Sequence, residues 1–404
     1  MKNALVLRTT VALALSGLVL SGCGKSEGAS SDDGSVKVGV VLPFSGVQAT
    51  IAKLEGQGAE VAATMINDEG GIDGKWKIDL VEVDDQLDPA RSATVVRDLN
   101  DQGVQLAVGG QTSDLCKSSA EASQRFNMTF IGAHCTSPEL VDPPITDNFF
   151  MIGQQMTDLA TAIGTGLAKR YPDVDTWDVV TYDVEVMRGS WDIAKQAMEA
   201  ELGHEVQVGE QYSVPIGATS MRKEISGLVS SGDKTKRGLF LGIYGAGTTS
   251  FIQQAKPTGL LDEYGVLAQT GVYWPTATSL DGQAPAIYNV HDYFYACQDD
   301  PENDEFVAAF EKATGEKPDA GAYQSYLAIK LLEAAVTEAG STDTADVQEA
   351  LKGLSIETPM GPTMEIGAES HAGTGGVTTA LLQGDPKAPQ GVSITECDVF
   401  PVGD

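Results

Sequence analysis

Apolar and polar residues alternate along the chain in short runs, and two spacings dominate. Val36 to Leu42 is an apolar run of the length of a buried strand. Apolar residues then recur every three to four positions from Ile51 to Met65, which indicates a helix, and Gly70-Gly71 ends it. The same alternation continues and predicts strands at 77–83, 104–108 and 128–133, with helices at 89–100 and 114–125 between them.

A second series of the same kind begins near residue 157. It predicts helices at 157–170, 190–202, 219–230 and 246–256 that alternate with strands at 177–182, 205–214, 238–244 and 265–270. Residues 291–298 predict one more strand, and helices follow at 303–314, 321–339 and 344–353. Residues 360–404 are rich in Gly, Thr and Pro, with short strand-like runs such as 377–382 that we expect to return to a lobe.

Strands that alternate with helices of this length predict parallel sheets joined by right-handed crossovers. Two successive series predict an α/β protein with two doubly wound parallel-sheet lobes. The 404 residues are enough for two buried cores, and the apolar fraction of 42% is ordinary for a globular protein.

Charge then excludes one class of partner. The chain has 26 Lys and Arg against 57 Asp and Glu, a net charge of −31. Such a charge repels phosphate backbones and anionic lipid headgroups, so we expect no nucleic-acid partner. A solvated acidic surface is the simplest explanation of this charge.

The N-terminus carries an export signal. Lys2 and Arg8 precede the short apolar stretch 9–20, which is too short to span a membrane as a helix. Leu20-Ser21-Gly22-Cys23 resembles the lipobox of bacterial lipoproteins, in which the cysteine carries the lipid, so Cys23 is the predicted lipidation site. The alternative is an ordinary signal peptide with a free Cys23. Residues 24–35 have almost no apolar content and predict a flexible tether for a domain anchored to the cell membrane outside the cytoplasm.

The remaining four cysteines form an even number in an oxidising compartment. Three pairings are possible. We favour Cys116–Cys135 and Cys297–Cys397, the first because its cysteines lie in neighbouring loops of the predicted strand order. Four buried free thiols are the alternative. No CxxC occurs, and we expect neither a metal nor a cofactor.

Glycines and hydroxyls follow three predicted strands of the first series. The loops contain Ser45, the run Gly109-Gly110-Gln111-Thr112-Ser113, and the run His134-Cys135-Thr136. Ligands of open parallel sheets bind outside the carboxyl ends of the strands, and N–H groups at helix N-termini favour an anion there. These loops therefore predict a site for a ligand carboxylate. The alternative is that the hydroxyls only cap the helices.

Several segments together resemble the branched-chain amino-acid family of solute-binding proteins that serve ABC importers. They are VKVGVVLPFSG, NDEGGIDGKWKIDLVEVDDQLDPA, GGQTS and CTSPEL, in the family's order and spacing over about residues 36–360. The resemblance implies the type I periplasmic-binding fold, in which two lobes joined by three hinge strands close on a small molecule. It places lobe one at 36–152 plus 293–361 and lobe two at 153–292 plus 362–404.

The resemblance also implies roles for individual residues. Ser113 and Thr136 match the family's hydroxyl ligands for the ligand carboxylate, and His134 stands where a backbone group usually serves. Tyr244 matches an aromatic residue of the second lobe that packs on the ligand. The complete set of predicted ligand-binding residues is Ser45, Gln111, Thr112, Ser113, His134, Thr136, Tyr182, Tyr244 and Thr270.

Two positions depart from the family's pattern. Thr270 stands where amino-acid binders place an acid for the ligand ammonium, and Met187 stands where many have a tyrosine. A buried ammonium without a carboxylate is costly, so either another acid such as Asp183 or Glu185 serves, or the ligand is not an α-amino acid. Urea, an amide, or an aromatic or aliphatic carboxylate then becomes a candidate, and Tyr273-Trp274 forms either a wall of the site or ordinary packing.

The sequence thus favours a monomeric, lipid-anchored solute-binding protein that delivers its ligand to ABC-transporter permease subunits. A ligand-sensing domain of the same fold that signals to a membrane receptor is the alternative. No GxSxG, HExxH or Walker loop is present, so an enzyme such as an extracytoplasmic hydrolase is disfavoured.

Overall fold

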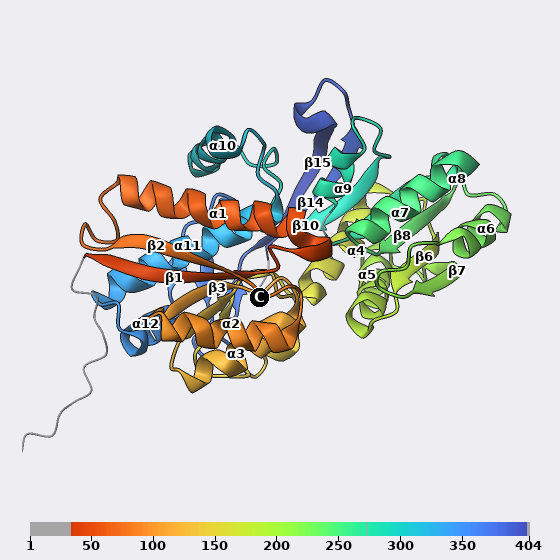
Figure 1. Cartoon of the computed structure of the whole chain (residues 1–404). Coiled ribbons are helices and arrows are strands. Elements are labelled where there is room, and N and C mark those ends of the chain that lie inside the picture. The colour runs from red at the N-terminus through yellow and green to blue at the C-terminus, as the bar shows by residue number, and fades with distance from the viewer. Residues whose placement is uncertain (1–33, 272, 402–404) are drawn as a thin grey trace, which may run out of the picture. The chain divides into compact units, whose positions relative to one another are not determined.

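The computed structural model describes residues 34–271 and 273–401 (Figure 1). The predicted signal at 1–23, with the lipidation site Cys23, lies outside the described residues, as does the predicted tether apart from residues 34 and 35. Two large sheets account for most strands, and a small one joins β11 (Ser355–Ile356), β12 (Met364–Ile366) and β13 (Gly373–Thr374).

The first sheet has five parallel strands in the order β2-β1-β3-β4-β5. Its strands are β1 (Ser35–Leu42), β2 (Lys77–Asp84), β3 (Leu106–Gly109), β4 (Thr129–Gly132) and β5 (Phe149–Met151). The helices that accompany it are α1 (Ala49–Asp68), α2 (Pro89–Asp101), α3 (Ser113–Arg125), α10 (Pro301–Thr314), α11 (Ala320–Ala339) and α12 (Thr344–Leu351). Short 3-10 helices lie at Gly46–Gln48 and Pro138–Leu140.

Helices cover both faces of this sheet because the side chains of β1 alternate between them. Val38 and Val40 pack in one core cluster with α1 and α11, whereas Val41 packs in another with α2 and α3. Figure 1 shows α1 and α2 on opposite faces of the sheet. The apolar run at 36–42 therefore belongs to a strand that is buried on both sides, as parallel strands require.

The second sheet has seven strands in the order β15-β14-β10-β9-β8-β6-β7. Its strands are β6 (Thr176–Tyr182), β7 (Gln207–Val214), β8 (Arg237–Gly242), β9 (Val266–Thr270), β10 (Ile287–His291), β14 (Gly376–Gly384) and β15 (Val392–Pro401). The helices of this part are α4 (Met156–Arg170), α5 (Glu185–Leu202), α6 (Arg222–Ser230), α7 (Ala246–Ala255), α8 (Leu260–Glu263) and α9 (Trp274–Ser279), with 3-10 turns at Lys256–Thr258 and Pro389–Gly391. The α/β fold class predicted from the sequence is confirmed.

The second sheet is not wholly parallel. Strands β6 to β10 are parallel, but β14 is antiparallel to β10 and β15 is antiparallel to β14. The prediction of a strand at 291–298 is wrong, because β10 ends at His291. The aromatic residues that follow β10 are buried by packing against other rings and not by strand pairing. Tyr293, for example, stacks on Tyr323 of α11 with ring centroids 4.5 Å apart. Periodicity does not distinguish these two kinds of burial.

The chain passes between the two sheets three times. It leaves the first sheet after β5, returns after β10, and leaves again after β13. The segments that lead into the first and third crossings are hydrogen-bonded to each other, since Met151 N of β5 donates to His371 O at 2.9 Å and Met151 bridges Ala372, just before β13. The middle crossing, residues 292–300, contains three aromatic residues that recur below: Tyr293, Phe294 and Tyr295.

The close packing of α1 on α11 depends on Gly58. A Cβ built there would lie 1.9 Å from the carbonyl oxygen of Ala322, so the helix backbones are in contact. Gly58→Ala is expected to lower the free energy of unfolding by about 3 kcal/mol, because one helix must move away from the other. Urea unfolding measures this loss. Gly189→Ala is the matched control, since a Cβ built on this helical glycine of α5 has nothing within 4 Å. Its free energy of unfolding should rise by about 0.5 kcal/mol, because alanine favours the helix over glycine.

Two disulfides join Cys116 to Cys135 and Cys297 to Cys397, with Cα atoms 6.4 and 5.6 Å apart. This is the pairing that the sequence analysis favoured. The first bridge connects α3 to the loop after β4, and the second connects the middle crossing to β15. Among the described residues, no helix combines the length and apolar character needed to cross a membrane.

Candidate functional site

The loops after β3 and β4 meet through the hydroxyl of Ser113. Its Oγ accepts hydrogen bonds from the backbone N–H groups of Thr136 at 3.3 Å and Ser137 at 3.1 Å. Thr112 is the N-cap of α3, and its Oγ1 accepts from Leu115 N at 3.4 Å. Thr112 therefore caps a helix, as in the alternative that the loop hydroxyls serve only as helix caps. The Ser113 hydroxyl, in contrast, retains a proton that it can donate to a ligand.

Gln111 contacts a buried acid on α1 that the sequence analysis did not select. Its Nε2 donates to Glu55 Oε2 at 3.1 Å, and its Oε1 is buried without a hydrogen-bond partner among the described residues. Burial, with a smaller contribution from Asp319, raises the pKa of Glu55 to about 8. Glu55 is therefore protonated at neutral pH.

The ring of His134 is directed at α11. Its Nδ1 lies 2.8 Å from Gln324 Oε1 and its Nε2 lies 3.1 Å from Ser325 Oγ. Because Gln324 Oε1 can only accept, Nδ1 carries the proton and Nε2 accepts from the serine hydroxyl. Burial lowers the pKa of His134 to about 4. The 3.9 Å approach of Nδ1 to Glu55 Oε1 therefore joins two neutral groups and is not an ion pair at neutral pH.

Ser45 lies at the start of the 3-10 helix after β1. Its side chain is exposed, and its backbone N–H donates to Asp84 Oδ1 at 3.3 Å. Ser45 thus stays at the carboxyl edge of the first sheet, where parallel topology brings the ends of β1 and β2 together.

The two predicted tyrosines of the second sheet contact each other. Tyr182 is buried at the end of β6, and its hydroxyl donates to the backbone oxygen of Tyr244 at 2.9 Å. The rings meet edge to face with centroids 5.0 Å apart. Burial raises the pKa of Tyr182 to about 12, so this hydroxyl remains a donor. Tyr244 is only partly buried, so it is the one of the pair with ring surface left for a ligand.

Thr270 is fully buried at the end of β9, and its Oγ1 lies 3.4 Å from Ser190 Oγ of α5. The two acids proposed in its place are both exposed, and Asp183 forms an ion pair with Arg188. The structure thus groups Ser113 with Thr136 and Gln111 with His134 on the first sheet, and Tyr182 with Tyr244 on the second.

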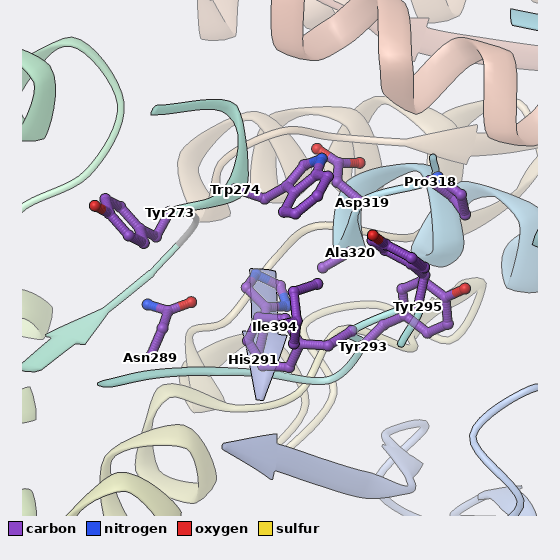
Figure 2. A pocket seen from close by; sticks show the side chains of 11 residues that line it. Tyr273, Trp274, Asn289, His291, Tyr293, Tyr295, Pro318, Asp319, Ala320 and Ile394 are labelled. Atoms are coloured by element: carbon purple, nitrogen blue, oxygen red, sulfur yellow. The ribbon is translucent and has the colours of Figure 1, made fainter. Parts of the chain in front are cut away.

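A narrow pocket lies along the middle crossing (Figure 2). Its walls come from β10 and β15 of the second sheet, from the start of α9, from the middle crossing and from the N-terminus of α11. None of the nine predicted ligand residues lines it. The lining residues are Tyr273, Trp274, Asn289, His291, Tyr293, Phe294, Tyr295, Pro318, Asp319, Ala320 and Ile394. Tyr273 and Trp274, proposed above as a wall of the site, are both buried in this lining.

A chain of buried polar contacts runs from this pocket to the predicted loops. His291 Nδ1 lies 2.5 Å from Asp292 Oδ1, and Gln324 Nε2 donates to Asp292 Oδ2 at 2.6 Å. Gln324 contacts His134, as described above. Burial opposes protonation of His291, but the charge of Asp292 outweighs it and raises the pKa of His291 above its usual value. The loop after β4 and the middle crossing are therefore connected through α11.

Sequence reasoning missed Glu55, Asp292 and Asp319. Glu55 had a signal, because it lies on the apolar face of α1 between Ile51 and Gly58, where a carboxyl group is unusual. Asp319 follows a proline and precedes a long helix, which indicates an N-cap and no more. The described residues contain no group of three or more His, Cys, Asp or Glu side chains placed to hold a metal ion.

Comparison with known proteins identifies relatives with the same layout. The family model described as periplasmic binding protein matches residues 35–385. The leucine-, isoleucine-, valine-, threonine- and alanine-binding protein of Pseudomonas aeruginosa is 25% identical over 328 residues, which cover 81% of this chain and 84% of that protein. The leucine-specific-binding protein of Salmonella typhimurium is 27% identical over 354 residues, with 83% and 88% covered.

Solved structures show the same fold at lower identity. A solute-binding protein of an ABC transporter from Rhodopseudomonas palustris, in complex with 3,4-dihydroxybenzoic acid, superposes with a TM-score of 0.77 at 20% identity and covers 92% of this chain and 99% of its own. A branched-chain amino acid transporter substrate-binding protein from Streptococcus pneumoniae, in complex with isoleucine, superposes with a TM-score of 0.76 at 18% identity. The superposition covers 91% of this chain and 99% of that protein. These relatives are binding proteins of transporters and not enzymes.

Proposed function

Because the chain belongs to the periplasmic binding protein family that includes the leucine-, isoleucine- and valine-binding proteins, we propose that it is the extracytoplasmic solute-binding lipoprotein of an ABC importer. The observation that carries the proposal is the match over residues 35–385, which includes the first sheet, the second sheet except β15, and all three crossings. Cys23 would hold the lipid, and permease subunits would receive the solute from a monomeric binding protein.

The proposed ligand is a small polar molecule held between the carboxyl edges of the two sheets. The Ser113 hydroxyl and the N–H groups at the start of α3 suit a ligand carboxylate, and Tyr244 offers ring surface from the second sheet. A branched-chain amino acid or a related amide or carboxylate fits these donors. Closure of the two lobes on the ligand, centred on the three crossings, would be favoured by the ligand's higher affinity for the closed form.

A thermal-shift screen of the purified chain tests this function. The panel contains leucine, isoleucine and valine, other amino acids, urea and short amides, and benzoate with its hydroxylated forms. A solute at 100 times its Kd stabilises the protein by about 2.7 kcal/mol, which raises the Tm of a chain of this size by about 3 °C. We expect at least one class to produce such a shift in a saturable manner. A flat response to every class, with folding verified by circular dichroism, would contradict the proposal.

A further inference from the structure

Gln324 of α11 connects the loop after β4 to the middle crossing, with one hydrogen bond at each end of its amide. Its Oε1 accepts from His134 Nδ1 at 2.8 Å, and its Nε2 donates to Asp292 Oδ2 at 2.6 Å. All three side chains are buried. Because a buried polar group without a partner is costly, both ends of the amide must be satisfied together, and the group at one end determines what the other end can bind.

The charge of Asp292 decides which end of this amide faces it. A carboxylate only accepts hydrogen bonds, so it requires the Nε2 end and leaves Gln324 Oε1 for His134. His134 Nδ1 then carries the proton, and its Nε2 accepts from the Ser325 hydroxyl at 3.1 Å. His291 Nδ1, 2.5 Å from Oδ1, binds the other carboxylate oxygen of Asp292. One order of donors and acceptors therefore extends from the end of β10 to the loop after β4.

His134 is held in its loop by its ring. Within the described part of the chain, its backbone N–H and C=O form no hydrogen bond, whereas both ring nitrogens do. Two residues further on, Thr136 donates its backbone N–H to Ser113 Oγ at 3.3 Å. The contacts of the ring with α11 therefore help to set where this loop lies relative to Ser113. Binding groups keep a precise position only when the residues behind them are fixed.

We propose that Gln324 is a positioning residue for the ligand: it orients the loop after β4 through His134 and takes its own orientation from Asp292 at the start of the middle crossing. The consequence for ligand affinity rests on the proposed function, whereas the orientation of His134 can be measured without a ligand. Asp292 itself forms no hydrogen bond with the loop among the described residues. An effect of Asp292 on the loop must therefore pass through Gln324.

Nitrogen NMR of the full chain labelled with ¹⁵N-histidine tests this orientation. The shifts of the two ring nitrogens show which one carries the proton, and the His134 signals are assigned by their absence in His134→Gln. We expect the Nδ1–H tautomer in the unmodified chain. In Asp292→Asn, the one remaining oxygen accepts from His291, so the new amide donates to Gln324 and reverses the Gln324 amide. His134 should then change to the Nε2–H tautomer and donate to Ser325.

The double variant Asp292→Asn/Gln324→Glu should reverse this change. Its new amide donates to its new carboxylate, which accepts from His134, so the Nδ1–H tautomer returns with the number of charges unchanged. Gln269→Met is the matched control, because Gln269 is a fully buried glutamine of β9 whose Nε2 donates to Ile243 O at 2.9 Å, and it should leave the His134 signals in place. If the double variant does not fold, Asp292→Asn alone decides: an unchanged Nδ1–H tautomer overturns the proposal.

Calorimetric titrations with leucine, benzoate and urea measure the effect on affinity. Gln324→Met keeps the length of the side chain and removes both hydrogen bonds, so it should weaken the binding of a solute that the unmodified chain binds by about tenfold. Gln269→Met should not. Equal affinity in Gln324→Met overturns the positioning role and leaves the proposed function intact. Binding of no solute by the unmodified chain, with the expected tautomers of His134, would have the opposite meaning: the orientation of the loop by Gln324 stands and the proposed function fails.

Discussion

Replacing Cys297 and Cys397 together by alanine is expected to lower the free energy of unfolding by about 4 to 5 kcal/mol. The two cysteines are 100 residues apart, and closing a loop of that length in the unfolded chain accounts for about 4.7 kcal/mol. The bridge holds the middle crossing against β15, and both segments contribute to the pocket through Tyr295 and Ile394. Urea unfolding at constant pH measures the loss.

The Cys116→Ala/Cys135→Ala variant controls for this result, since Cys297–Cys397 is then the one bridge left in the described part of the chain. Adding a reductant to that variant should again cost about 4 to 5 kcal/mol. Adding it to the Cys297→Ala/Cys397→Ala variant should cost less, because the remaining loop spans only 19 residues and corresponds to about 3 kcal/mol. A loss below about 1 kcal/mol in the first variant would show that the bridge does not constrain the unfolded chain.

Glu55→Gln is expected to change how stability depends on pH. The folded protein holds the Glu55 proton with a pKa of about 8, whereas the ordinary value is 4.5. A folded-state pKa above the unfolded value means that stability falls as pH rises between these two values, by about 1.4 kcal/mol per pH unit where the slope is steepest. Glutamine resembles the protonated side chain and does not titrate. As the pH rises from 6.5 to 8, the free energy of unfolding of the variant should therefore increase by about 1 to 2 kcal/mol relative to that of the unmodified protein.

The difference between the two proteins isolates Glu55, because His134, His291 and Asp319 titrate in both. Burial raises the pKa of Asp319, and its charge in turn contributes to the raised pKa of Glu55. Glu60→Gln removes an exposed carboxylate from the same helix and controls for the change in net charge. Free energies of unfolding in urea at six pH values give the two curves. Parallel curves for Glu55→Gln and the unmodified protein would mean that Glu55 is already ionised in the folded state.

The sequence predicted most of the fold because burial on two sides leaves a strong pattern. The run at 36–42 and the apolar face at 51–65 correspond to β1 and α1 with errors of a few residues at their ends. The aromatic run at 291–298 misled because rings that stack on α11 give the same pattern as a strand. The antiparallel pairing of β14 and β15 depends on contacts between distant parts of the chain, which no local pattern reveals.

The predicted site was incomplete for a similar reason. Loops after parallel strands must gather at one edge, so Gln111, Ser113 and Thr136 could be selected from position alone. Glu55 and Asp319 come from the interior of one helix and the start of another, and what sets them apart is their burial and the unpaired oxygen of Asp319. Those properties exist only once α1 and α11 pack together at Gly58.

The middle crossing both lines the pocket and connects the two sheets. Residues 292–300 continue from β10 of the second sheet, line the pocket with Tyr293, Phe294 and Tyr295, and lead into α10, which belongs to the core around the first sheet. A substitution that retunes this wall for another solute therefore also alters the joint about which the proposed closure turns. In an engineered sensor based on this protein, substitutions in the middle crossing that change the selectivity should also shift the signal of the ligand-free sensor. Substitutions around Ser113 should change the selectivity alone.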